Sequence, residues 1–263
     1  MNINWILFFF AGDVFHNRHE IGVNTLHIAK KFFDVLKDFN IHLIPGNHDA
    51  FLSSTVEVNS VEILERNNVF VYSNPTTIQV SDKKVTFCPW KTQVKDLEKV
   101  DMLVGHFEIP NFKMNATKIC EHGDSSTNLF EKAQAVITGH FHLRDHRQYE
   151  NGKYVLYLGS PYEMDFGDRE QQKGVTIIDF DNFDTNFIEN KITPKHYRLK
   201  ISEIIQKKYL SLPSIIKGNI VSIYVDTKID TLTLDLLTSK LMQYEPLQFR
   251  TEFDILDQAQ IDP

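Results

Sequence analysis

The sequence predicts a mixed α/β (α+β) fold, with two packed sheets flanked by helices and a small C-terminal β-α-β unit. Two observations predict it. Four short apolar runs each lead through a glycine into polar residues, which is typical of buried strands whose ends carry a site. Helix-patterned segments come between the early strands, and turn-bounded strand pairs follow them, as expected for parallel units joined to hairpins.

The first strand is expected in "WILFFF" (5–10), which leads into Gly12-Asp13. A secretory signal would need a positively charged start and a small-x-small cleavage site, whereas residues 1–4 contain no Lys or Arg. No stretch supplies the about 20 apolar residues of a membrane-spanning helix. We therefore interpret the run as a buried strand of a soluble, cytoplasmic protein without a membrane partner.

The following segments extend this core. Residues 22–40 carry apolar residues at helical spacing, and "IHLIPGNHD" (41–49) is the second strand, so the two strands form a parallel pair. Residues 61–67 predict a second helix. Two more buried strands are expected in "DMLVGHFE" (101–108) and "AVITGHFH" (135–142).

Three turn-bounded strand pairs complete the first part of the chain. They are expected at 76–90, at 147–161, where Asn151-Gly152 is a strong hairpin signal, and at 174–189. Beyond about 190 the chain becomes locally basic and ends in a β-α-β pattern. We expect one domain over 1–200 and a smaller one over 201–263.

Composition narrows the protein class. With 263 residues, 42% of them hydrophobic and 24% charged, the chain can bury a sizeable core. Cys88 and Cys120 match no metal or redox spacing, which favours a reducing compartment. The formal charge of −7 argues against an indiscriminate nucleic-acid coat, although bound metal would change that balance.

Five polar side chains that follow the predicted strands are candidate metal ligands. They are Asp13, Asn47, His106, His140 and His142. Carboxylate, amide and imidazole groups without thiolates suit Mn²⁺, Fe²⁺ or Zn²⁺ and not a structural zinc site. Two such ions about 3.5–4 Å apart would activate water and neutralise a phosphoryl transition state. The pattern therefore predicts a hydrolase.

Two further residues are candidate catalytic groups in the "GNHD" motif. His48 follows the expected ligand Asn47 and would be free to contact the phosphate or the leaving oxygen. Asp49 would then fix the tautomer and orientation of His48.

The ordered motifs Gly12-Asp13, Gly46-Asn47-His48-Asp49, Gly105-His106 and Gly139-His140-Phe141-His142 resemble those of the calcineurin-like metallophosphoesterase superfamily. Within it, "GDVFHNR" (12–18) and "LGSPYEMDFGDREQQKG" (158–174) resemble the SbcD-type DNA-repair nucleases. "GHFEIPNF" (105–112) and "EHG" (121–123) are similar to phage recombination endonuclease subunits of that family. The resemblance covers nearly the whole chain.

This resemblance implies a two-sheet α/β/β/α sandwich, a C-terminal unit that caps DNA, and a metal-dependent DNA exo/endonuclease subunit. It implies a role in recombination or double-strand-break processing, in the host cytoplasm if the gene belongs to a phage. Two divalent ions, Mn²⁺ above all, would be its cofactors. DNA, an SMC-like coiled-coil ATPase and a second copy of the chain would be its partners. The basic stretch 191–208 is interpreted as a solvated face, with a DNA-backbone contact as the alternative.

The resemblance also implies a role for each candidate. Asp13 would bridge the two ions. Asn47, His106 and His140 would complete one site, and His142 would serve the other. His48 would assist the chemistry, while His16 matches a histidine associated with exonuclease action through positioning of the DNA end.

One family motif is absent from the sequence. The family opens on a strand ending in Asp-x-His, which supplies two ligands to the site shared by Asp13 and His142, and no such motif precedes Asp13. We expect that site to be weak, and the chain to be an incomplete version of a working nuclease through a misplaced start, split gene or intron. The end at "DQAQIDP" is expected to be incomplete as well. Two alternatives stay open: a general metallophosphoesterase acting on nucleotides or phosphoproteins, and an inactive DNA-binding remnant.

Overall fold

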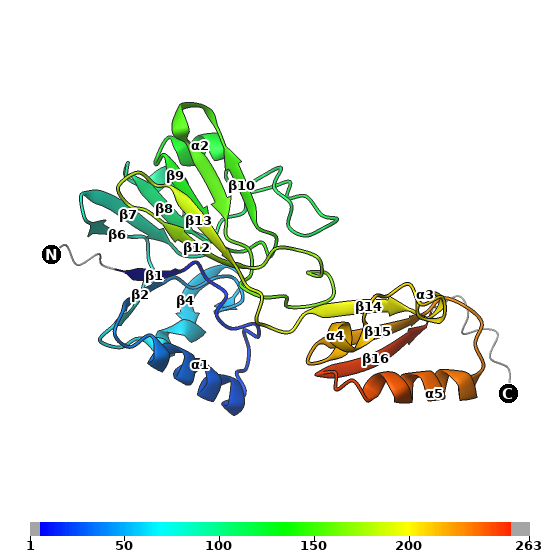
Figure 1. The fold of residues 1–263 in the computed structure, drawn as a ribbon. Coiled ribbons are helices and arrows are strands. Elements are labelled where there is room, and N and C mark those ends of the chain that lie inside the picture. Colours follow the sequence, from blue (N-terminus) through cyan, green and yellow to red (C-terminus); the bar gives the residue numbers. More distant parts are fainter. Residues whose placement is uncertain (1–5, 254–263) are drawn as a thin grey trace. The chain divides into compact units, whose positions relative to one another are not determined.

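The computed structural model describes residues 6–253, so Trp5 of the expected first strand and the C-terminal "DQAQIDP" lie outside it (Figure 1). Contacts divide the chain into two units. The first combines Met1–Ser160 with Gly174–Glu189, and the second combines Pro161–Lys173 with Asn190–Pro263. The predicted domains, 1–200 and 201–263, divide the chain at another place, and they stay a prediction.

A small parallel sheet opens the first unit, in the order β1-β2-β5. Its strands are β1 (Leu7–Phe10), β2 (Asn40–Leu43) and β5 (Val69–Val71), and α1 (Val23–Val35) connects the first two. The predicted parallel pair is therefore confirmed. The expectation that the first strand is buried is wrong: β1 is half-buried because it forms the edge of its sheet.

The larger sheet of the first unit has six strands, in the order β10-β11-β9-β8-β7-β6. They are β6 (Thr76–Val80), β7 (Lys83–Cys88), β8 (Met102–Gly105), β9 (Ala135–Thr138), β10 (Asp145–Gln148) and β11 (Tyr154–Tyr157). The predicted hairpins β6-β7 and β10-β11 lie at its two edges, and the four central strands are parallel. In this register Gly105 is opposite Thr138, so β8 and β9 end side by side.

Smaller elements complete this unit. They are the antiparallel pairs β3 (Ala50–Leu52) with β4 (Thr55–Asn59) and β12 (Gly174–Ile178) with β13 (Thr185–Glu189), helix α2 (Ser126–Phe130), and the 3₁₀ turns η1 (Ser60–Leu64), η2 (Val94–Asp96) and η3 (Glu150–Gly152). The β12-β13 pair is the one predicted at 174–189. The helix predicted at 61–67 is wrong: only the short η1 turn forms, and Glu65 is already extended.

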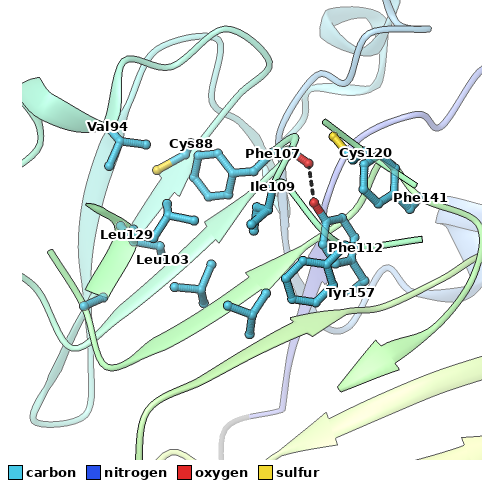
Figure 2. Close-up of a cluster of buried hydrophobic side chains, with 13 residues drawn as sticks. Cys88, Val94, Leu103, Phe107, Ile109, Phe112, Cys120, Leu129, Phe141 and Tyr157 are labelled. Carbon is cyan, nitrogen blue, oxygen red and sulfur yellow. Dashed lines mark hydrogen bonds between the residues drawn. The ribbon is translucent and has the colours of Figure 1, made fainter. Parts of the chain in front are cut away.

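The six-stranded sheet has an apolar core on each face. Alternate residues face opposite sides: Leu103 and Val136 pack with Phe112 and Tyr157 in the cluster of Figure 2, where the Tyr157 hydroxyl donates to the Phe107 carbonyl at 2.9 Å. The other face packs against the small sheet. There Phe9 of β1 meets Phe87 of β7, with ring centroids 5.3 Å apart. Helix α1 covers the far side of the small sheet through Phe33. These layers confirm the predicted two-sheet sandwich.

The second unit is built on a three-stranded parallel sheet in the order β14-β15-β16. Its elements are β14 (His196–Lys200), α3 (Ile201–Ile205), α4 (Leu212–Ile216), β15 (Ile220–Val225), α5 (Thr231–Met242) and β16 (Gln248–Phe253). The predicted terminal β-α-β pattern is confirmed as β15-α5-β16. Within residues 6–253, no helix is long and apolar enough to cross a membrane.

Candidate metal centre

Four of the five predicted metal ligands meet at one edge of the first unit. Asp13, His106 and His140 each place one ligand atom within 4.8 Å of the others. The Oδ1 atom of Asn47 lies between the two rings, 2.9 Å from Nε2 of His106 and 2.8 Å from Nδ1 of His140. Each residue lies just beyond the end of a parallel strand: β1, β2, β8 or β9. The strand ends therefore converge as the sequence predicted.

The fifth candidate, His142, is outside this cluster in the described part of the chain. Its backbone carbonyl accepts a hydrogen bond from the N–H of Ser160 at 3.1 Å. His142 as a ligand of a second ion stays a prediction.

The hydrogen bonds of His106 define which of its nitrogens can bind a cation. Its Nδ1 lies 2.6 Å from the carbonyl oxygen of Ala11, which can only accept, so Nδ1 carries a proton. Nε2 then faces Asp13 Oδ2 at 3.2 Å and the Asn47 amide oxygen. A histidine fixed in this way by a backbone carbonyl is typical of metal sites. The residues present thus fit a divalent cation of the Mn²⁺, Fe²⁺ or Zn²⁺ kind.

Buried charge shifts the pKa values of the cluster in opposite directions. Burial opposes ionisation of Asp13, but the charge and hydrogen bond of His106 outweigh it and lower the Asp13 pKa to about 2. Burial also opposes the charged form of His106, yet the Asp13 carboxylate prevails and raises its pKa. Burial, together with the nearby His106, lowers the pKa of His140 to about 4. Neutral His140 and ionised Asp13 are the forms that bind metal.

The glycines of the motifs allow this close approach. A Cβ atom on Gly46 would collide with Oδ1 and the backbone nitrogen of Asp13 and with the His106 ring. Asp13 and His140 themselves have φ angles of 58° and 81°, in the left-handed region that most side chains avoid. The glycine before each candidate ligand is therefore a packing requirement of the cluster.

Asp49 has partners other than the expected one. Its side chain is fully buried, and its carboxylate accepts hydrogen bonds from the N–H groups of Asp13 (2.7 Å), Val14 (3.3 Å), Phe15 (3.0 Å) and Gly46 (2.9 Å). Burial raises the pKa of Asp49, an effect that these N–H groups oppose. The expectation that Asp49 orients His48 is wrong. Asp49 holds the backbone on which Asp13 stands.

His48 and His16 lie together at the mouth of the cluster. The N–H of His48 donates to Asp13 Oδ1 at 2.8 Å, and its Nδ1 lies 2.9 Å from the carbonyl oxygen of His16. The two imidazoles stack with centroids 5.0 Å apart and an interplanar angle of 14°. His16 is exposed and His48 is half-buried. Both rings are therefore open to a ligand at the cluster.

Sequence reasoning missed two residues beside His140. Glu108 Oε1 lies 3.5 Å from His140 Nε2 and 3.1 Å from His122 Nε2. The Trp90 ring lies 5.1 Å from that of His140 and 5.8 Å from that of His106. Glu108 could have been found from the sequence, because it is a carboxylate two positions after the candidate ligand His106. Trp90 follows β7, whose end lies beside that of β8, and only the sheet order reveals this.

Comparison with known proteins agrees with this geometry. Residues 2–144, which contain all five predicted ligands, match the calcineurin-like phosphoesterase family. Over 201 residues the chain is 28% identical to a protein of Enterobacteria phage T4 named exonuclease subunit 1. That match covers 72% of this chain and 56% of the phage protein, so the chain spans little more than half of its relative. The chain belongs to the calcineurin-like phosphoesterase family.

Proposed function

We propose that this chain is a metal-dependent nuclease subunit that hydrolyses phosphodiester bonds in DNA. The convergence of Asp13, Asn47, His106 and His140 at four strand ends is the observation that carries the proposal. Similarity to a phage protein named as an exonuclease subunit favours a nuclease over a general phosphoesterase. By the same resemblance we propose Mn²⁺ as the metal, recombination or break processing as the role, and an SMC-like ATPase as partner.

Asp13, Asn47, His106 and His140 would hold one cation, and Asp13 and His142 would contribute to a second. Bound divalent ions offset the charge of the phosphate and make water a better nucleophile. The chain's own contribution is pre-organisation. The Ala11 carbonyl directs His106 Nε2 inward, and the Asp49 carboxylate fixes the backbone of Asp13.

His48 is the proposed catalytic residue that is not a ligand. Its backbone N–H donates to the Asp13 carboxylate, and its Nδ1 is hydrogen-bonded to the His16 carbonyl. Nε2 is therefore the nitrogen left for the substrate. The protonated ring can donate from Nε2 to a leaving oxygen while Nδ1 keeps its hydrogen bond. His16, stacked on His48, is proposed to position the strand end.

Glu108 is proposed as a positioning residue for His140. The Nδ1 atom of His140 faces Asn47, and its Nε2 faces Glu108. A carboxylate on the outer nitrogen of a ligating histidine fixes its tautomer, and loss of such a partner typically weakens metal binding about 10–100-fold.

Hydrolysis and Mn²⁺ affinity, measured side by side, test the proposal. The substrates are linear duplex DNA, single-stranded DNA and bis-p-nitrophenyl phosphate. We expect His140→Ala to lose at least about tenfold in Mn²⁺ affinity and to lose hydrolysis. His48→Ala should keep Mn²⁺ affinity and lose hydrolysis. His27→Ala, at an exposed position of α1, is the control and should match the parent chain.

Three outcomes would contradict the proposal. Hydrolysis of the small diester without any cleavage of DNA would favour a general phosphoesterase. DNA binding without hydrolysis, both in this chain and in a version extended by upstream sequence containing Asp-x-His, would favour a non-catalytic protein. Unchanged Mn²⁺ affinity in His140→Ala would refute the metal centre itself.

A further inference from the structure

Two segments of the first unit run side by side from the metal centre to the surface. One, residues 13–19, follows β1, and the other, residues 47–51, follows β2. At the inner end His48 is bonded to Asp13. From the other segment, Nη2 of Arg18 reaches back to the inner end and donates to the Asn47 carbonyl at 2.9 Å. At the outer end the rings of His19 and Phe51 meet edge to face, with centroids 5.8 Å apart and an interplanar angle of 88°.

The outer pair is open to solvent. Phe51 is 48% exposed although it follows the fully buried Ala50 directly, and it lies outside the buried clusters of the core. His19 is exposed as well. A single exposed phenylalanine is ordinary on a protein surface. This one is in ring contact with His19, on the segment that carries Asp13, and it follows His48 by three residues on the other segment.

The groups along these segments match the chemistry of a nucleic-acid strand. Arg18 is half-buried and donates to the backbone carbonyl of Asn47, which places a permanent positive charge beside the ligand cluster. Guanidinium groups bind phosphates strongly. Base stacking on an aromatic ring contributes about 1–3 kcal/mol per base and tolerates any sequence. In chain order the two segments carry candidate cation ligands, imidazoles, a guanidinium and an aromatic ring.

We propose that Phe51 and His19 form a stacking site for an unpaired nucleobase of the strand whose phosphate lies at the metal centre. The proposal rests on the nuclease function proposed above and names its substrate class: a single strand, or a duplex end that has frayed. Inside a duplex each base is stacked on both faces and exposes only its edges in the grooves, so it cannot offer a face to Phe51. The site would therefore favour unpaired strands over the interior of a duplex.

An abasic strand provides the test. Binding of fluorescent single-stranded oligonucleotides with phosphorothioate linkages, which resist hydrolysis, is measured in the presence of Mn²⁺, with normal nucleotides or with abasic ones at the bound end. The parent chain should prefer the base-bearing strand by about 5–150-fold, which is the stacking energy expressed as a ratio of dissociation constants. Phe51→Ala should reduce this preference to nearly one. Phe51→Tyr should retain it, and His19→Ala should lower it by a smaller factor.

Tyr149 offers a matched control. It is 37% exposed and lies in the β10-β11 turn, at the end of the sheet opposite His140. Tyr149→Ala should leave the preference unchanged, and thermal unfolding confirms that each variant is folded. An equal preference in the parent chain and Phe51→Ala would overturn the stacking site.

Cleavage of DNA with Mn²⁺ separates this inference from the proposed function. If the parent chain cleaves DNA but shows no preference for base-bearing strands, the stacking site fails and the nuclease stands. If the parent chain shows the preference, Phe51→Ala abolishes it, and the parent chain cleaves no DNA, then the nuclease proposal fails and the binding site stands.

Discussion

Replacement of Asp49 by asparagine separates the two roles that can be assigned to this residue. If Asp49 organises the backbone of Asp13, the variant should be less stable and should bind Mn²⁺ less tightly. If instead it orients His48, as the sequence suggested, turnover should fall while Mn²⁺ affinity and stability stay unchanged. The hydrogen bonds favour the first outcome.

The size of the effect follows from those bonds. An asparagine can place its oxygen at the Oδ2 position, where Asp13, Gly46 and, more weakly, Val14 donate. Its NH₂ group then faces the buried N–H of Phe15, and a buried donor without an acceptor costs about 1–3 kcal/mol. The remaining bonds lose their charge assistance, which roughly halves their strength. Because burying the neutral amide is easier, we expect a net loss of about 2–4 kcal/mol.

Urea unfolding and calorimetric titration with Mn²⁺ measure both effects. We expect Mn²⁺ affinity to fall about 10–100-fold, as it does when a ligand loses its support. Asp101→Asn is the matched control: its carboxylate accepts one backbone N–H, that of Lys84 at 2.7 Å, and should cost no more than about 1 kcal/mol. Asp49→Asn with stability within about 0.5 kcal/mol of the parent and unchanged affinity would refute the reasoning.

Three further predictions follow from the structure. Gly46→Ala should reduce Mn²⁺ affinity at least about tenfold by titration calorimetry, since its Cβ would displace Asp13; unchanged affinity would contradict the packing argument. Burial lowers the pKa of His42 to about 4 from its usual 6.5, so the unfolded chain binds the proton first and stability should fall as pH drops from 6.5 to 4. The His42 contribution is at most about 1.4 kcal/mol per pH unit. Urea unfolding at several pH values measures it, and a His42→Gln variant whose unfolding free energy depends on pH as steeply as that of the parent would contradict the prediction. In the second unit Lys173→Met should cost about 3–5 kcal/mol because it leaves buried Asp168 without its 3.1 Å ion pair, and Asp168→Asn/Lys173→Met should recover part of that loss in thermal unfolding.

The sequence was sufficient to predict the meeting of the candidate ligands because the relevant signals are local. Each candidate ligand follows an apolar run and a glycine, and a helix between the first two strands forces them to be parallel. Parallel strands end at one edge, so Asp13 and Asn47 had to lie close together. The same argument applies to His106 and His140, whose strands β8 and β9 are neighbours. The layers of the fold were predictable from the apolar runs of the strands and the helical spacing of the apolar residues in 22–40.

The incorrect and missed predictions concern properties that depend on tertiary contacts. The half-buried state of β1 depends on its position at the edge of a sheet, and an apolar run does not encode that position. The partner of Asp49 depends on which backbone N–H groups point inward, and four of them outcompete the neighbouring imidazole. Trp90 reaches His140 through the sheet order, which brings β7 beside β8. Contacts of this kind cannot be inferred from spacing along the chain.

The backbone of the two proposed ligands that follow β1 and β9 links the Asp49 network to the proposed metal binding. Asp13 and His140 both occupy the left-handed region, at a cost of about 1–2 kcal/mol for a residue with a Cβ. Such a conformation persists only where surrounding contacts fix it. For Asp13 those contacts are the Asp49 carboxylate, which accepts its N–H, and the N–H of His48, which donates to its side chain. The strain is therefore compensated by protein groups before any cation binds. The binding energy of the cation is then not consumed in reorganising the loop, which is why a change at Asp49, outside the ligand set, should appear as a loss of metal affinity.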